Sequence, residues 1–137
     1  MPELTGVLET ALYVEDTERS ARFYEETFGF RRLANDYRLC ALSVADRQVL
    51  LLFKRGASRQ HLNISGGVIP SHDGRGEQHF ALAVPRAALP EWEAKLAAKG
   101  IPLESRVRWE LGGESIYFRD PDGHSVELAT PGIWPIY

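Results

Sequence analysis

The chain shows the same order of predicted secondary structure twice, and this repeat limits the fold more than any other feature of the sequence. In each half, a strand precedes a helix and about three further strands. A shift of 70 residues places 9–14 on 79–84, with Ala, Leu and Val in identical positions, and a shift of 76 places 46–51 on 122–127. We therefore predict an α+β protein built from two copies of one βαβββ unit.

Hydrophobic periodicity locates the elements of each half. In the first half, strands are predicted at 7–14, 31–34, 38–45 and 48–54, with a helix from about 16 to Gly29. In the second half, strands are predicted at 79–84, 103–108, 114–119 and 124–129, with a helix from 89 that stops at Gly100. Residues 55–77 have no hydrophobic period and are rich in Gly and Ser, which predicts a long loop. The expected organisation is one domain, 1–137, with a first module at 5–54, a linker and lid at 55–77, a second module at 78–130 and a tail at 131–137.

Composition narrows the class of partner and the compartment. The 137 residues, 44% of them hydrophobic, suit one globular domain with its own core. A net charge of -3 with scattered basic residues argues against nucleic acid or an anionic membrane as partner. No apolar stretch approaches the roughly 18 residues that span a bilayer. The single cysteine, Cys40, lies in an apolar run and is interpreted as a small buried hydrophobe. With no export signal at the N-terminus, we expect a cytoplasmic protein.

Three predicted strands each place one ionisable side chain on a face of otherwise uncharged, mostly small residues. A carboxylate or imidazole among such residues is costly unless it is paired or binds a metal. The three side chains are Glu9, His79 and Glu127. Two carboxylates and an imidazole suit a divalent cation such as Mn²⁺, Fe²⁺, Ni²⁺, Zn²⁺ or Mg²⁺, and three protein ligands leave positions open for substrate. The repeat places a fourth equivalent position at Leu51, which cannot ligate a metal.

Each candidate also has a simpler interpretation. Glu9 fits a solvent-facing strand residue or an ion-pair partner, and His79 fits a core histidine with satisfied hydrogen bonds. Tyr117 is equally compatible with substrate binding and with packing, whereas Arg119 suits a carboxylate partner better than a substrate. His72 in the long loop is either an exposed polar residue or an acid/base carried by a lid.

Two runs resemble the vicinal oxygen chelate superfamily, which includes glyoxalase I, bleomycin and fosfomycin resistance proteins, extradiol dioxygenases and methylmalonyl-CoA epimerase. Residues 12–30 (LYVEDTERSARFYEETFGF) look like its opening run, and 117–127 (YFRDPDGHSVE) like its closing run. The similarity covers nearly the whole chain. It implies paired βαβββ modules whose mixed sheets curl around a central cavity with a metal, usually in a homodimer. The metal positions of the superfamily fall on Glu9, His79 and Glu127.

The departures from the superfamily pattern separate its branches. The first metal position, often histidine, is Glu9 here. Glyoxalase I has an acidic fourth ligand where this chain has Leu51, which argues against glyoxalase activity. Extradiol dioxygenases carry a histidine several residues before the equivalent of Tyr117, and 106–115 contain none.

The leading hypothesis is a metal-dependent enzyme that chelates neighbouring oxygens of a small substrate, with a lyase, isomerase or dioxygenase outcome. Glu9 or Glu127 would act as base, and Tyr117, Arg119 and Tyr13 would contact the substrate. The alternative is a small-molecule binding protein similar to bleomycin resistance proteins, without metal or catalysis. That alternative predicts a pocket rich in aromatic side chains, among them Tyr13, Tyr117 and Trp109.

Overall fold

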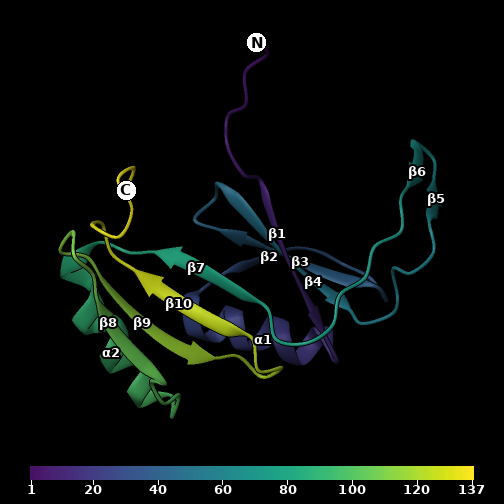
Figure 1. Ribbon diagram of the computed structural model, residues 1–137. Helices are drawn as coiled ribbons and strands as arrows, with labels where there is room; N and C mark the ends of the chain where they lie inside the picture. Colours follow the sequence, from purple (N-terminus) through teal and green to yellow (C-terminus); the bar gives the residue numbers. More distant parts are fainter. The chain divides into compact units, whose positions relative to one another are not determined.

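The computed structural model describes residues 1–137, and the chain divides into two compact units, Met1–Gly76 and Glu77–Tyr137 (Figure 1). Each unit has its own sheet and its own α-helix. None of the helices has the length and apolar character needed to span a bilayer.

The first unit is a βαβββ module. Its elements are β1 (Glu9–Val14), α1 (Thr17–Phe28), β2 (Arg31–Asn35), β3 (Leu39–Val44) and β4 (Gln48–Lys54). The strand order is β1-β4-β3-β2, with β1 parallel to β4 and the other neighbours antiparallel. The sheet is therefore mixed, as expected.

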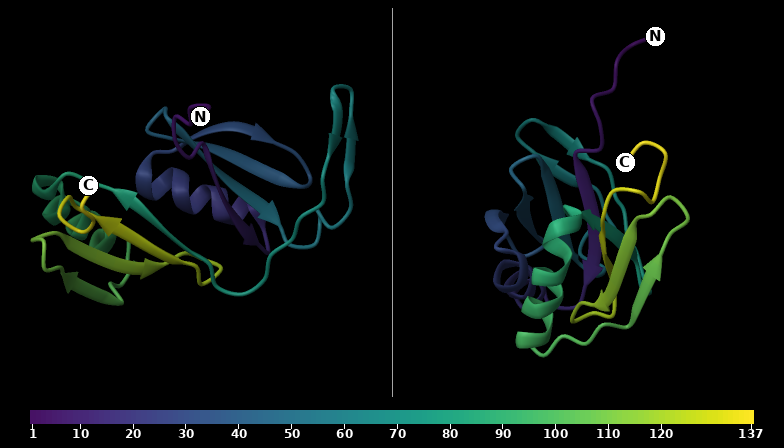
Figure 2. Two further views of the ribbon diagram at one scale, coloured as in Figure 1. Left: turned by 45° about the horizontal axis from the view of Figure 1, so that its top comes forward. Right: turned by 90° about the vertical axis from the view of Figure 1, so that its left-hand side faces the viewer.

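Local chemistry sets the ends and the orientation of α1. The Asp16 carboxylate accepts hydrogen bonds from the backbone N–H groups of Glu18 and Arg19, and Gly29 ends the helix at φ 72. The helix covers one face of its sheet (Figure 2) and buries Tyr24 completely. Strand side chains alternate between faces, so those at Glu9, Ala11 and Tyr13 belong to the opposite, open face.

The second unit has the same organisation. It comprises β7 (His79–Ala83), a 3₁₀ turn (Arg86–Ala88), α2 (Leu89–Ala98), β8 (Ser105–Arg108), β9 (Glu114–Arg119) and β10 (Ser125–Ala129). The order β7-β10-β9-β8 reproduces that of the first sheet. Again, the first and last strands of the module, β7 and β10, are parallel neighbours. The prediction of two βαβββ modules is confirmed.

The strand registers also confirm both sequence shifts. Ala11 lies opposite Leu51 in the first sheet, and Ala81 lies opposite Glu127 in the second. These are the same pairs that shifts of 70 and 76 residues relate. Leu51 therefore occupies the position in its sheet that Glu127 occupies in the other.

The prediction of a long loop at 55–77 is wrong in part. The segment contains a hairpin of β5 (Leu62–Ile64) and β6 (Gly67–Ile69), which projects from the first sheet (Figure 1). Strands of three residues are too short to produce a detectable alternation. The Gly66-Gly67 pair between two short apolar runs was the available hairpin signal.

Cys40 on β3 matches its predicted character. It is a free, buried thiol with 1% of its surface exposed. Burial raises the pKa of the thiol, which keeps it protonated and unreactive at neutral pH.

Candidate metal site

Two of the predicted ligands meet on the second sheet. His79 begins β7 and Glu127 lies in the adjacent parallel strand β10, with His79 opposite Ser125 in the register. The Nε2 atom of His79 is 3.2 Å from Oε1 of Glu127. Glu127 is 7% exposed, whereas about half of the His79 side chain is open to solvent. A largely buried carboxylate thus faces an accessible imidazole.

A backbone contact fixes the orientation of the His79 ring. Its Nδ1 lies 3.0 Å from the carbonyl oxygen of Ser125, which can only accept a hydrogen bond. Nδ1 therefore carries a proton and donates it, and in the neutral ring Nε2 presents a lone pair to Glu127. Two electron-pair donors at 3.2 Å repel each other unless a proton or a metal ion lies between them.

The separation of these two atoms suits a shared metal ion. Imidazole nitrogen and carboxylate oxygen bind zinc-like ions at about 2.1 Å, so neighbouring ligands lie about 3.0 Å apart at a right angle and about 3.4 Å apart at a tetrahedral angle. The observed 3.2 Å falls within this interval. The structure contains no cluster of three or more His, Cys, Asp or Glu side chains suited to holding a metal ion. The donor pair therefore fits two of the three ligands that the sequence predicts.

The second oxygen of Glu127 is held by two residues, Ser115 and Trp109, for which the sequence predicted no such contact. The Ser115 hydroxyl donates to Oε2 of Glu127 at 2.5 Å, and the indole N–H of Trp109 donates to that hydroxyl at 2.9 Å. Trp109, which the sequence placed among the aromatic side chains of a possible ligand pocket, thus also has a polar role. Strand alternation placed Ser115 on the correct face, but a strand serine carries no signal of its own.

Tyr117 lies beside the pair. Its ring stacks on the His79 ring, with centroids 6.2 Å apart and an angle of 28°. Burial, and then the negative charge of Glu127, raise the pKa of the Tyr117 hydroxyl. The phenol therefore keeps its proton at neutral pH and can donate a hydrogen bond.

Arg119 pairs with carboxylates, the partners that the sequence favoured over a substrate. Its guanidinium donates to both oxygens of Glu104, at 2.6 and 3.0 Å, and to Glu77 at 3.3 Å. It also donates to the Gly123 carbonyl at 3.0 Å. These bonds fix the side chain at the end of β9.

The third predicted ligand, Glu9, belongs to the first unit. It is exposed at the start of β1 and lies opposite Val49. Tyr13, four residues further along the same strand, has its hydroxyl 2.7 Å from Nδ1 of His72. Burial, and then the charge of Asp73, raise the pKa of Tyr13, so its hydroxyl keeps its proton at neutral pH.

His72 is packed against the first sheet and is half-buried. Its ring meets the Phe53 ring edge-on at 4.5 Å, and its backbone N–H donates to the Ser58 carbonyl at 2.9 Å. The next residue, Asp73, accepts from Arg59 at 2.9 Å. The end of the 55–77 segment is therefore anchored on the aromatic side chains Tyr13 and Phe53.

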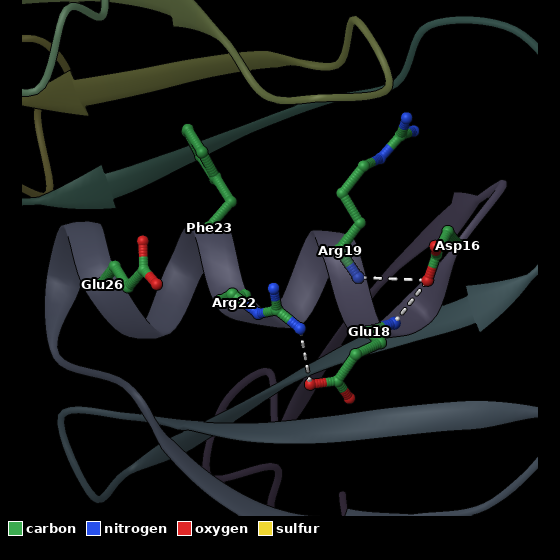
Figure 3. Close-up of a pocket in the computed structure, with 6 residues that line it drawn as sticks. All are labelled: Asp16, Glu18, Arg19, Arg22, Phe23 and Glu26. Atoms are coloured by element: carbon green, nitrogen blue, oxygen red, sulfur yellow. Dashed lines mark hydrogen bonds and ion pairs between the residues drawn. The ribbon is translucent and has the colours of Figure 1, made fainter.

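A hollow of about 440 Å³ lies along the exposed side of α1 (Figure 3). Its lining comprises Asp16, Glu18, Arg19, Arg22, Phe23 and Glu26. Asp16 already caps the helix, and Glu18 is 3.6 Å from Arg22. None of the predicted site residues lines this hollow.

Comparison with known proteins places the chain in a family. The chain is 29% identical to the metallothiol transferase FosB of Bacillus licheniformis, over 96% of this chain and 79% of that protein. It is 30% identical to a catechol-2,3-dioxygenase of Bacillus subtilis, over 85% of this chain but 38% of the dioxygenase. The crystal structure of a lactoylglutathione lyase from Agrobacterium tumefaciens has a TM-score of 0.88 and 32% identity, covering 98% of this chain and 99% of that one. The family model of the Glyoxalase/Bleomycin resistance protein/Dioxygenase superfamily matches residues 6–128, and the chain belongs to this superfamily.

Proposed function

We propose that this protein is a metal-dependent enzyme in which Glu9, His79 and Glu127 hold one divalent ion. The substrate is a small molecule with two neighbouring oxygens that chelate that ion. Mn²⁺, Fe²⁺, Ni²⁺, Zn²⁺ and Mg²⁺ are all compatible with two carboxylates and one imidazole.

One observation carries the proposal, namely the contact between His79 Nε2 and Glu127 Oε1 at 3.2 Å. The Ser125 carbonyl turns the imidazole toward Glu127, and the Ser115 hydroxyl leaves Oε1 as the oxygen that faces the imidazole. A histidine held through its second nitrogen is the usual arrangement of a metal ligand. Both side chains are thus prepared to bind a cation.

The protein residues would divide the chemistry as follows. A bound divalent ion polarises substrate oxygens and stabilises negative charge on them. Both oxygens of Glu127 are engaged, so the exposed Glu9 is the carboxylate better able to accept a proton, with Glu127 as the second candidate base. Tyr117 would donate a hydrogen bond to the substrate. Tyr13, and Arg119 on release from its carboxylate partners, would contact more distant parts of the substrate.

The relatives bound the reaction class. Their names describe a metallothiol transferase, a catechol-2,3-dioxygenase and a lactoylglutathione lyase. We propose lyase, isomerase or dioxygenase chemistry and a screen with α-keto, diol and catechol compounds. We further propose that the enzyme acts in the cytoplasm as a homodimer, which sedimentation velocity would test.

Metal content is the decisive measurement. Tag-free wild type should contain close to one equivalent of a transition metal by mass spectrometry. His79→Ala and Glu127→Ala should lose it, because each removes a ligand. Glu91→Gln, at an exposed carboxylate on α2, is the matched control and should keep the metal. Wild type that contains no metal and takes up none of the five candidate ions would contradict the proposal.

That contrary result would favour the second candidate, a metal-free binding protein. The open face of the first sheet supports it, because Ala11 and Leu51 lie there beside the aromatic side chains Tyr13 and Phe53. Binding of aromatic compounds, measured by calorimetry with and without a chelator, separates the two candidates. Affinity that is unchanged by the chelator would indicate a binding protein.

A further inference from the structure

We propose that Ser115 and Trp109 are positioning residues for Glu127, forming a hydrogen-bond chain that holds Oε2 of this carboxylate and makes it a ligand through Oε1 alone. The metal-binding part of this inference rests on the proposed function above. The hydrogen-bond chain itself involves only residues of the second unit and does not depend on a metal.

The donors and acceptors fix the direction of every hydrogen in the chain. An indole N–H can only donate, so the Ser115 oxygen must accept from Trp109. The single hydroxyl hydrogen of Ser115 then points to Oε2 of Glu127, 2.5 Å away. Glu127 is therefore the acceptor at the end of the hydrogen-bond chain, and its Oε2 atom is held by Ser115.

Burial keeps the hydrogen-bond chain on one of the two oxygens of Glu127. Ser115 is completely buried and Glu127 is 7% exposed, so water does not readily replace either partner. A serine hydroxyl left without its hydrogen bonds in such a place is unfavourable. The hydroxyl therefore remains on Oε2, and Oε1 is the oxygen that stays directed at His79.

The backbone holds the indole in place. Trp109 lies at the turn between β8 and β9, where its backbone N–H donates to the Gly113 carbonyl at 2.9 Å. Gly113 in turn donates to the Gly132 carbonyl at 3.0 Å. A Cβ atom added at Gly113 would stand 2.6 Å from the carbonyl carbon of Gly132, so only glycine permits this approach. The segment after β10 thus anchors the turn that carries the indole.

The indole N–H resonances in NMR spectra of the metal-free protein test whether the hydrogen-bond chain exists. The three tryptophans give three indole N–H peaks, which Trp92→Phe, Trp109→Phe and Trp134→Phe assign. Ser115→Ala removes the acceptor, and Glu127→Gln changes the group at the far end of the chain. Both substitutions should move the Trp109 peak and leave the Trp92 and Trp134 peaks in place. A Trp109 peak that neither substitution moves would overturn the proposal.

Metal affinity then tests the positioning role. We expect the Kd for Mn²⁺ or Zn²⁺ to rise roughly 10- to 100-fold in Ser115→Ala, the range typical of outer ligand partners, and less in Trp109→Phe. Because the two residues act in series, the double variant should bind no more weakly than Ser115→Ala alone. Ser115→Thr, which keeps the hydroxyl, should restore part of the affinity.

The outcomes separate the two proposals. Wild type that binds no metal would overturn the proposed function, while the indole peaks would still decide whether the chain exists. Wild type that binds metal, with Ser115→Ala equal to it in affinity, would overturn the positioning role. Additive losses in the double variant would also contradict a chain in series.

Discussion

The two units share one fold and one register, but their open faces carry opposite chemistry. In the second unit, Glu127 lies opposite Tyr117 and beside His79. At the positions that the repeat relates to Glu127 and Tyr117, the first unit has Leu51 and Ala41, which also lie opposite each other. The two units thus share one backbone arrangement, but the second has a His–Glu pair where the equivalent positions of the first are apolar.

The supporting residues differ in the same way. Ser115, which holds Glu127, lies opposite Ala129 in the second sheet, and its counterpart Leu39 lies opposite Phe53 in the first. The second unit therefore places a hydroxyl and a methyl group where the first places two large apolar side chains. The buried carboxylate of Glu127 thus has a polar supporting residue, whereas the equivalent position of the first unit holds the apolar Leu39.

Leu51→Glu should break this division and have the largest effect. In metal-free protein, replacing the half-buried leucine by a carboxylate should lower the free energy of unfolding by about 1–3 kcal/mol. If the proposed metal site forms, the new carboxylate should act as a fourth ligand, and Mn²⁺ should restore much of the lost stability. Urea unfolding with and without the ion measures both effects.

Leu51→Gln is the matched control for that experiment. It has nearly the same shape as the glutamate variant and should be destabilised to a comparable degree, but it lacks the charge that binds a cation. Stabilisation by Mn²⁺ that is equal in Leu51→Gln and Leu51→Glu would show that position 51 does not face the metal.

Strand periodicity explains how much of the fold and of the candidate site could be predicted from the sequence. Glu9, His79 and Glu127 were found because each interrupts a face of small side chains, and a period of two assigns that face directly. Leu51 followed from the repeat. Period and repeat are local properties of the sequence, so they identified the two modules and their open faces.

Periodicity and the repeat could not predict contacts between particular side chains. The Tyr13–His72 bond joins positions 59 residues apart, and the link from Trp109 to Ser115 depends on the conformation of one turn. Serine and tryptophan are both common in strands and turns, so neither residue type predicted the chain to Glu127. The hairpin at 62–69 was missed because its strands are so short.

Gly74→Ala should disturb the feature that only the first unit has, the packing of the 72–74 segment on Tyr13. A Cβ atom at this position would lie 2.3 Å from Cδ2 of Tyr13, so the segment has to move. We expect a loss of about 1–3 kcal/mol in the free energy of unfolding, as for other overpacked sites. Gly66→Ala is the control, because no atom lies within 4 Å of its added Cβ. Equal urea midpoints for the two variants would contradict the close packing of His72 and Gly74 on Tyr13.

Exposed ion pairs near the ends of the strands should show the smallest effects. A hydrogen bond from Arg119 lowers the pKa of Glu104 in the second unit, and one from Arg31, with a further bond from Ser43, lowers the pKa of Asp46 in the first. A carboxylate with a lowered pKa stabilises the fold above its ordinary pKa, and this contribution is lost as the pH falls through the lowered value. Both pairs are solvent-exposed, so their removal should leave the urea midpoint at pH 7 nearly unchanged. Carboxyl ¹³C titration by NMR should show a higher pKa for Glu104 in Arg119→Gln and for Asp46 in Arg31→Gln. Each variant is the control for the other unit, and a carboxyl whose pKa does not rise when its own arginine is replaced would show that the ion pair does not persist in solution.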